Sequence, residues 1–357
     1  MGVSVTKRLL HGPLQIENLP TNVTFSDGIY RILWYNPPLF LTTRPEAKYS
    51  GFTRCKFSNC AMLFDQCELE RSHAVIFYGR HLRQDVLKPI RRPLGQVWIF
   101  AADESPVHYN IDGDEWSDEN WRHRFNWTMT YDKTNTDIFL PYGKLQQRTH
   151  ANIRNYSAIA LQKFRGGILI SSHCNNKAER EKYAKILQRY IPIDIKGKCG
   201  HPWTCGTQYV HDNCFDILNS TYKFFLAFEN SLCRGYFTEK LFENYNYDTL
   251  IVTRGGGQGE ASATFPSGTV ISTDSFQSVD ELGEYLAALH MSPELYAERL
   301  KDKDKFYADS YSSVYQNAMC RLCEMMNKQD HFRKQIPDTF EWAYSSEPCR
   351  VPDDIPS

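Results

Sequence analysis

Chemically useful side chains gather directly after one strongly apolar segment of this 357-residue chain. Residues 223–228 predict a buried strand, and the polar residues that follow it are Glu229, Asn230, Tyr236, Glu239 and Lys240. Thr238 can cap a following helix whose free N–H groups attract an anion, and Lys240 adds a positive charge suited to a phosphate. Glu239 is suited to holding ribose hydroxyls. The same residues also fit a simple capping turn with an exposed Glu/Lys pair.

Two other patterns are compatible with a metal. Asp112 and Asp114 form the Asp-x-Asp pattern of metal-dependent sugar transferases, but they lie in a polar segment rather than after a hydrophobic strand. We therefore interpret them as solvated. Cys320 and Cys323, with His331 nearby, match half of a zinc site, yet no second pair of ligands has the matching spacing. We expect no metal site.

Cysteines and glycosylation signals point to an oxidising compartment. The chain has 11 cysteines and four N-x-S/T sequons, at Asn22, Asn126, Asn155 and Asn219. The odd number predicts at least one free thiol unless an intermolecular disulfide forms. No stretch approaches 18 apolar residues, and the first ten residues lack the apolar core of a signal peptide. We expect the lumenal part of a longer protein, with any membrane anchor supplied by a segment absent from this chain.

The elements that position these residues must belong to an ordinary globular protein. Hydrophobic residues make up 41% of the chain and charged residues 23%. Forty-one Lys and Arg against 42 Asp and Glu leave a formal charge of −1, so there is no global positive field for nucleic acid or an anionic membrane. The length predicts two domains.

Strand-like and helix-like segments alternate in both halves. Strands are predicted at 29–35, 74–78, 96–100, 167–172, 223–228 and 249–253, and helices at 179–190, 280–290 and 292–306. This alternation predicts two α/β domains with parallel sheets, with a boundary between residues 143 and 166. Two such domains facing each other would form a cleft, in which ligands bind beyond the carboxyl ends of the strands.

Several motifs resemble those of the α1,3-fucosyltransferases of glycosyltransferase family 10. Residues 227–231 and 236–241 closely resemble the donor motif of the family. Residues 103–106, Asp-Glu-Ser-Pro, are similar to its N-terminal acidic motif. The central signature is matched by 125–131 and 137–143, and the phosphate-side turn by 171–180. The matches run in the family's order over about residues 25–325.

The resemblance implies two facing Rossmann-like domains of the GT-B type with a cleft between them. Residues 1–150 would be the acceptor-side domain, 151–325 the GDP-fucose-binding domain and 326–357 a C-terminal tail. The implied reaction is the inverting transfer of L-fucose from GDP-fucose, in α1,3 linkage, to a GlcNAc of a glycan or glycoprotein acceptor, with no required cofactor. The implied location is the Golgi lumen, as the catalytic region of a type II membrane protein.

Individual roles follow from the matching positions. Glu104 occupies the position of the general base, which removes a proton from the acceptor hydroxyl as that oxygen attacks. Arg180 and Lys240 match the residues that neutralise the leaving pyrophosphate. Asn230, Tyr236 and Glu239 match donor contacts. Arg180 also fits an exposed helix residue in an i,i+4 pair. Arg254 and the glycines after it depart from the family's Val-Pro-Val pattern, which puts the donor contacts of that loop in doubt.

The C-terminal part resembles invertebrate members, including those that act on the N-glycan core. This resemblance implies that Cys320 and Cys323 are bridged to cysteines near the N-terminal domain, with Cys55 and Cys60 as candidates. We therefore favour the core GlcNAc of N-glycans as the acceptor. Outer Gal-GlcNAc (Lewis-type) units remain an alternative, as does a catalytically inactive relative that only binds glycans. Retention of Glu104, Arg180, Glu239 and Lys240 together favours an active enzyme.

Overall fold

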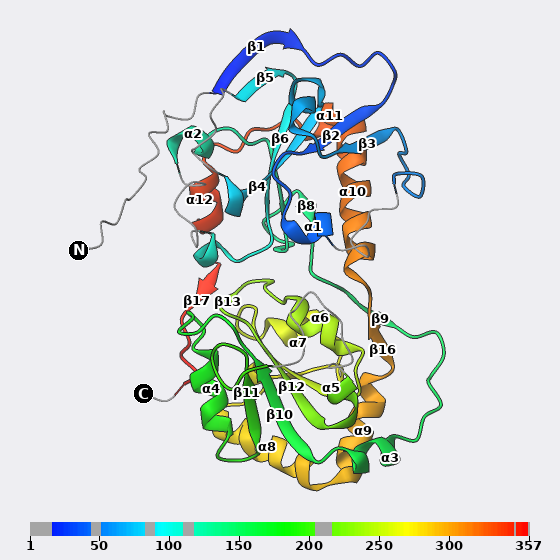
Figure 1. Cartoon of the computed structure of the whole chain (residues 1–357), viewed down its shortest axis with the longest axis vertical. Coiled ribbons are helices and arrows are strands. Elements are labelled where there is room, and N and C mark those ends of the chain that lie inside the picture. Colours follow the sequence, from blue (N-terminus) through cyan, green and yellow to red (C-terminus); the bar gives the residue numbers. More distant parts are fainter. Residues whose placement is uncertain are drawn as a thin grey trace, which may run out of the picture. The chain divides into compact units, whose positions relative to one another are not determined.

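The computed structural model describes residues 16–43, 51–82, 90–109, 118–203, 216–345 and 348–355, and these form two compact units (Figure 1). Unit 1 contains the described positions up to 130, then 136–139 and 316–345. Unit 2 contains 131–135, 140–315 and the final segment 348–355. The segment 316–345, which the sequence analysis divides between the second domain and a tail, thus packs with unit 1.

A parallel sheet organises unit 1. Its strand order is β3-β2-β4-β6-β7-β8, and every neighbouring pair is parallel. The strands are β2 (Tyr30–Trp34), β3 (Cys60–Leu63), β4 (Ala74–Tyr78), β6 (Val97–Ala102), β7 (Trp127–Thr130) and β8 (Ile138–Phe139). All residues of β4 and β6 are buried, which explains why both read as continuous apolar runs. A separate parallel pair joins β1 (Ile16–Asn22) to β5 (Ile90–Leu94).

Aromatic side chains fill the core of unit 1. Phe77 of β4 packs against Trp98 of β6 and against Trp121 of the short helix α2 (Glu119–Arg122). The helix α12 (Thr339–Tyr344) joins this core, because Trp342 contacts Phe100 edge-on. The C-terminal part of the sequence therefore completes a core built mainly by the first 130 residues. Short helices α1 (Leu39–Thr43) and α11 (Gln329–Phe332) complete the unit.

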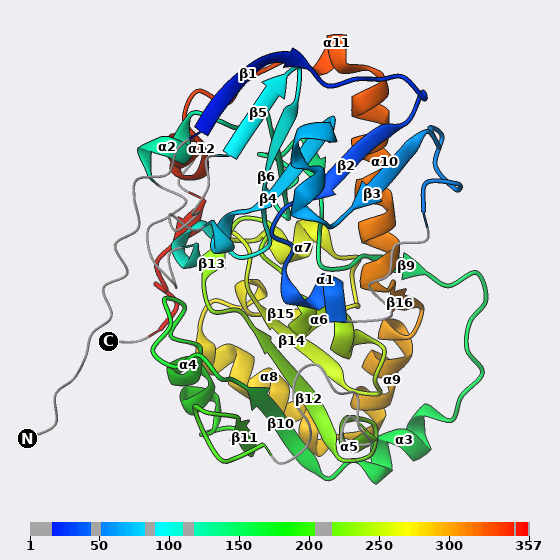
Figure 2. The same cartoon turned by 45° about the horizontal axis from the view of Figure 1, so that its top comes forward.

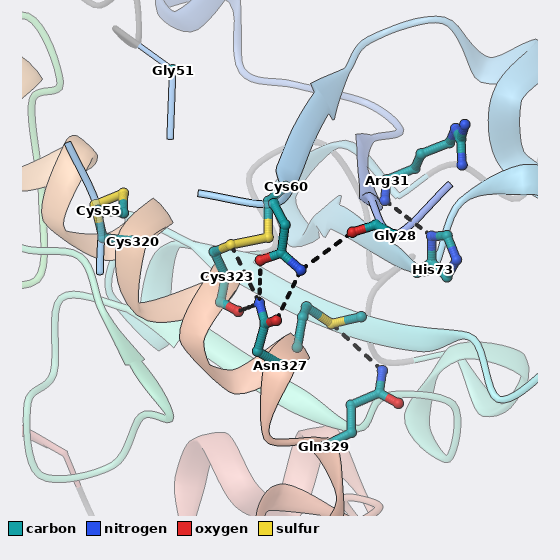
Figure 3. Close-up of a disulfide and its surroundings, with 12 residues drawn as sticks. Gly28, Arg31, Gly51, Cys55, Cys60, His73, Cys320, Cys323, Asn327 and Gln329 are labelled. Atoms are coloured by element: carbon teal, nitrogen blue, oxygen red, sulfur yellow. Dashed lines mark hydrogen bonds between the residues drawn. A yellow bond between two sulfur atoms is a disulfide. The ribbon is translucent and has the colours of Figure 1, made fainter. Parts of the chain in front are cut away.

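Two disulfides tie one helix to the start of unit 1. The helix α10 (Tyr311–Asn327) carries Cys320, bonded to Cys55, and Cys323, bonded to Cys60 (Figure 3). These are the four cysteines that the resemblance singles out. The side chains of Asn327 and Asn59 exchange hydrogen bonds of 3.0 Å beside the second bridge. Because both sulfurs of the Cys-x-x-Cys pair are in disulfides, they are not zinc ligands.

Unit 2 contains a second parallel sheet, of order β11-β10-β12-β14-β15 (Figure 2). Its strands are β10 (Arg165–Ile170), β11 (Ile193–Lys196), β12 (Tyr222–Phe228), β14 (Leu250–Arg254) and β15 (Ile271–Ser272). The predicted strands at 167–172, 223–228 and 249–253 are confirmed as β10, β12 and β14. A small antiparallel pair joins β9 (Leu145–Gln147) to β16 (Phe306–Ala308).

Helices cover both faces of this sheet, because alternate residues of each strand point to opposite sides. Phe224, Leu226 and Phe228 of β12 pack with α4 (Arg180–Leu187), α8 (Val279–Met291) and α9 (Pro293–Lys303). Phe225 and Ala227 pack on the other side with α5 (Asp216–Ser220), α6 (Glu239–Tyr245) and α7 (Glu260–Thr264). The helix α3 (Tyr156–Gln162) joins the first cluster through Ala160.

The predicted α/β class with parallel sheets is confirmed in both units. The helix expected from Ser292 and Pro293 forms as α9, with the Ser292 hydroxyl accepting a hydrogen bond from the Leu295 N–H at 3.2 Å. It ends at Lys303 rather than at 306, because residues 306–308 pair with β9. None of the helices that the structure describes has the length and apolar character needed to cross a membrane.

Candidate active site

The predicted donor residues follow β12, so the donor segment, residues 229–240, starts at the carboxyl edge of the unit 2 sheet. Glu229 is its centre. Its carboxylate is only 1% exposed and accepts hydrogen bonds from the Thr238 N–H at 2.8 Å and the Thr238 hydroxyl at 2.9 Å. Burial raises the pKa of Glu229, and the Lys240 charge opposes that rise. Glu229 therefore fixes the turn that leads into α6.

The ammonium group of Lys240 joins three side chains of this segment. It lies 2.9 Å from the Thr238 hydroxyl, 3.1 Å from the Glu239 carboxylate and 3.2 Å from the Glu229 carboxylate. Burial disfavours the charged form of Glu239, but Lys240 outweighs this and lowers the pKa of that carboxyl. The side chains of Lys240 and Glu239 remain 22% and 36% exposed. The turn thus presents one cation and one carboxylate that are already held in place.

Asn230 and Tyr236 are more deeply placed. The Asn230 carbonyl accepts a hydrogen bond from the Ala178 N–H at 3.1 Å, which ties the donor segment to the loop before α4. Tyr236 is buried, with its ring 4.9 Å from that of Tyr131 and 6.4 Å from that of Tyr142. Its ring therefore packs against two other aromatic rings of unit 2.

Arg180 is buried rather than exposed. It is 2% exposed, and its guanidinium donates hydrogen bonds to the carbonyl oxygens of Phe228 at 3.2 Å and His173 at 3.3 Å. It also lies 3.2 Å from the carboxylate of Glu181. The alternative of a solvent-exposed helix residue is therefore wrong. Arg180 connects the 171–180 turn to the end of β12, directly before the donor segment.

The departure at Arg254 has a structural explanation. Arg254 is buried and forms two hydrogen bonds, of 2.8 and 2.6 Å, with Asp354 of the final segment. Its guanidinium also lies 4.6 Å from the centre of the Tyr183 ring. The same final segment is bonded through Cys349 to Cys233, where β13 (Leu232–Cys233) pairs with β17 (Cys349–Arg350). Arg254 therefore anchors the C-terminal strand segment to unit 2.

The glycines that follow Arg254 permit close packing against the donor segment. A Cβ at Gly255 would lie 2.7 Å from Cγ of Glu229 and 2.9 Å from the carbonyl oxygen of Tyr236. Gly256 has a φ of 74°, which favours glycine. This loop thus supports the donor segment from beside it.

Glu104 lies in unit 1, in the turn after β6. Its side chain is 22% exposed, and its carboxylate is 3.4 Å from the guanidinium of Arg80. The neighbouring Asp103 accepts a hydrogen bond from the Tyr78 hydroxyl, and Tyr344 of α12 donates one to the Pro106 carbonyl at 2.9 Å. The turn is therefore held from both β4 and α12.

The four sequons differ in their surroundings. Asn22 and Asn155 are exposed, and Asn155 caps α3 by accepting a hydrogen bond from the Ala158 N–H. Asn219 is half-buried and accepts one from the Asp248 N–H. The Asn126 amide donates to the Lys334 carbonyl at 2.9 Å and accepts from the Trp98 N–H at 2.9 Å. The Asn126 side chain is thus engaged in hydrogen bonds within unit 1, and Asn126 remains a predicted glycosylation candidate.

The residues considered for metal binding give no cluster in the described chain. No group of three or more His, Cys, Asp or Glu within the described ranges is arranged to hold an ion. Asp112 and Asp114 lie outside the described residues.

Comparison with known proteins places the chain in a family. The description "Fucosyltransferase, N-terminal" matches residues 30–143, and "Glycosyltransferase family 10 (fucosyltransferase) C-term" matches residues 160–342. The chain belongs to glycosyltransferase family 10, the fucosyltransferases, as the resemblance predicted.

Relatives in this family include two proteins of Drosophila melanogaster. Glycoprotein 3-alpha-L-fucosyltransferase A is 30% identical over 346 residues, covering 88% of this chain and 64% of that protein. Alpha-(1,3)-fucosyltransferase C is 27% identical over 322 residues, covering 84% of this chain and 70% of that protein. The chain thus spans slightly under two thirds of the length of the first of these.

Solved structures agree on the fold. A crystal structure of an alpha1,3-fucosyltransferase has a TM-score of 0.52 at 14% identity, covering 90% of this chain and 95% of the other. A crystal structure of an alpha1,3-fucosyltransferase with GDP-fucose has a TM-score of 0.50 at 14% identity, covering 92% and 93%. At this identity the likeness establishes the fold.

Proposed function

We propose that this protein transfers L-fucose from GDP-fucose, in α1,3 linkage and with inversion, to a GlcNAc of a glycan acceptor. The observation that carries the proposal is the preorganised donor segment, in which buried Glu229 holds Thr238 and Lys240 at the start of α6. Family membership supports the choice of donor, as does the similarly folded alpha1,3-fucosyltransferase whose crystal structure is with GDP-fucose.

Positive charge near the leaving group replaces a metal ion in this proposal. Lys240 is partly exposed and fixed by its neighbours, so it can neutralise the diphosphate with little reorganisation. Arg180 holds the 171–180 turn against the end of β12, and its guanidinium adds a positive charge next to the donor segment. Glu239 accepts hydrogen bonds from hydroxyl groups of GDP-fucose, while Asn230 and Tyr236 maintain the conformation of the donor segment.

Glu104 is the proposed general base. It removes the proton from the acceptor hydroxyl while that oxygen forms a bond to the anomeric carbon. The bond from that carbon to the diphosphate breaks with its electron pair, and attack from the opposite face inverts the configuration. Partial exposure of the Glu104 carboxylate is required for this role, because the acceptor must reach it.

The acceptor is proposed to be the core GlcNAc of N-glycans. The name of the first Drosophila relative includes the word glycoprotein, and the cysteine-rich C-terminal part resembles core-modifying members. Outer Gal-GlcNAc units are the alternative acceptor. The proposed location is the Golgi lumen, which the four disulfides among the described residues support, because such bonds persist in oxidising compartments.

The test is fucose transfer from GDP-fucose in excess chelator, with an N-glycan exposing its core GlcNAc and a Gal-GlcNAc disaccharide as acceptors. Product on the first acceptor alone supports the core proposal. Product only without chelator would favour a metal-dependent enzyme using Asp112 and Asp114. A catalytically inactive glycan-binding relative would bind the acceptor and give no product, with or without chelator.

A further inference from the structure

A second carboxylate adjoins the proposed base. Asp103 directly precedes Glu104, at the end of β6, and its Oδ1 accepts a hydrogen bond of 2.5 Å from the Tyr78 hydroxyl. Tyr78 is buried at the end of β4, where it lies opposite Ala101 in the parallel pairing with β6. The sheet register therefore places Tyr78 beside the end of β6, and Asp103 follows that end directly.

The charges around Asp103 come from three places in the described chain. Tyr78 ends β4, Arg80 lies in the 3-10 turn Gly79–His81, and Glu104 belongs to the same turn as Asp103. Burial and the charge of Glu104 raise the pKa of Asp103 to about 6, while the Tyr78 hydroxyl and Arg80 oppose that rise. Glu104 in turn lies 3.4 Å from Arg80. Among the described residues, two carboxylates thus lie close to the guanidinium of Arg80.

We propose that Asp103, held by Tyr78, is a positioning residue whose negative charge favours proton transfer to Glu104. The proposal rests on the proposed function, since it needs Glu104 as the base. When Glu104 takes the acceptor proton, two adjacent negative charges become one, so the neighbouring charge of Asp103 assists that step. Asp103 itself takes no proton from the substrate. The proton moves to Glu104, and the electron pair of the broken glycosyl bond leaves with GDP.

A pH dependence follows from this arrangement. Transfer should increase as pH rises through about 6, where Asp103 ionises. Tyr78→Phe removes the O–H donor that stabilises the Asp103 carboxylate. The rise should then move upward by roughly one pH unit, because a hydrogen bond to a charged group is worth about that much. At still higher pH this variant should regain the wild-type rate. A purely structural defect would not be reversed by pH.

Asp103→Asn removes the charge permanently and keeps the size of the side chain. We expect its kcat to fall roughly tenfold at neutral pH and to stay low when the pH is raised. Its KM for GDP-fucose should not change, because the proposed donor contacts are all in unit 2. Tyr35→Phe is the matched control, since Tyr35 is another partly buried tyrosine of unit 1 that packs against Phe77. Its pH profile should match that of the wild type.

The experiment is a set of pH–rate profiles from pH 5 to 9 for wild type and the four variants Tyr78→Phe, Asp103→Asn, Tyr35→Phe and Glu104→Gln. An unshifted profile for Tyr78→Phe would overturn the inference, even if Asp103→Asn fails to fold. A wild-type rate for Asp103→Asn would also overturn it. If Glu104→Gln is inactive in either case, the proposed function stands without the inference. If Glu104→Gln transfers fucose at the wild-type rate, the proposed role of Glu104 is wrong.

Discussion

The two candidate carboxylates, Glu229 in unit 2 and Glu104 in unit 1, are built in opposite ways. Glu229 is 1% exposed, satisfied by Thr238 and paired with Lys240. Glu104 is 22% exposed and lies at the edge of hydrogen-bonding distance from Arg80. The side chains that bind a charged nucleotide should be held in place before the nucleotide binds. A general base must instead keep its carboxylate accessible to the proton that it removes. The degree of burial therefore matches the roles proposed for the two regions, donor binding around Glu229 and proton removal at Glu104.

The largest expected effect is that of replacing Glu104, the more exposed of the two carboxylates. Glu104→Gln keeps the shape of the side chain but cannot accept the proton, so transfer should fall by about 10²- to 10⁴-fold. GDP affinity should be unchanged. Initial rates with GDP-fucose, combined with calorimetric titration of GDP, measure both. Equal loss of transfer and of GDP binding would mean that Glu104 is part of the nucleotide site.

The Lys240→Ala variant tests the preorganised donor segment of unit 2. It removes a partly exposed cation and leaves buried Glu229 without its ionic partner, so GDP affinity should fall by roughly 10- to 100-fold. Lys182→Ala is the matched control, because Lys182 is an exposed lysine of α4 that pairs with Glu179. GDP titration of both variants is the measurement. An unchanged affinity in Lys240→Ala would contradict the phosphate role.

Gly255→Ala probes how tightly the donor segment is supported. The added methyl would meet Glu229 and the Tyr236 backbone at under 3 Å, so we expect a loss of about 1–3 kcal/mol in unfolding free energy. Gly257→Ala is the control, since its nearest atom is 3.4 Å away, at the end of the Glu260 side chain. Chemical denaturation compares the two. Equal effects would show that the donor segment tolerates displacement.

The last expected effect concerns the stability cost of Asp103. Its pKa of about 6 in the folded state exceeds that of an unfolded aspartate, about 4. The folded state therefore holds the proton more tightly, and wild-type stability declines as pH rises from about 4 to 6. Asp103→Asn lacks this decline. The melting temperature of the variant minus that of the wild type should therefore increase between about pH 4 and 6 and remain constant above that range. A constant gap at all pH values would argue against a raised pKa.

Local sequence patterns predict much of the fold and part of the candidate site. Apolar runs placed β10, β12 and β14, and the Ser292-Pro293 pair placed the start of α9, because strands and caps depend on nearby residues. Burial could not be predicted in the same way. Arg180 meets the carbonyl of Phe228, and Arg254 meets Asp354, 100 positions away. Those pairings exist only once the sheet and the final segment have assembled.

Two residues beside the predicted site residues have roles in the structure that local sequence patterns do not predict. Glu229 is one of the polar residues that follow the predicted strand, and its place directly after the strand is the available signal of its role in the turn. Asp103 was noted only as part of the acidic motif. Its link to Tyr78 depends on the register of β4 and β6, which no local pattern specifies. Asn126 is a similar case, since its sequon gives no sign of the hydrogen bonds that its side chain makes.

The most direct test of the central claim is a fucose-transfer assay with the wild-type protein, GDP-fucose and excess chelator. The acceptors are an N-glycan with exposed core GlcNAc and a Gal-GlcNAc disaccharide. The account predicts an α1,3-fucosylated product on the N-glycan core, formed at the same rate with and without chelator. Absence of product on both acceptors, despite measurable GDP binding, would contradict it.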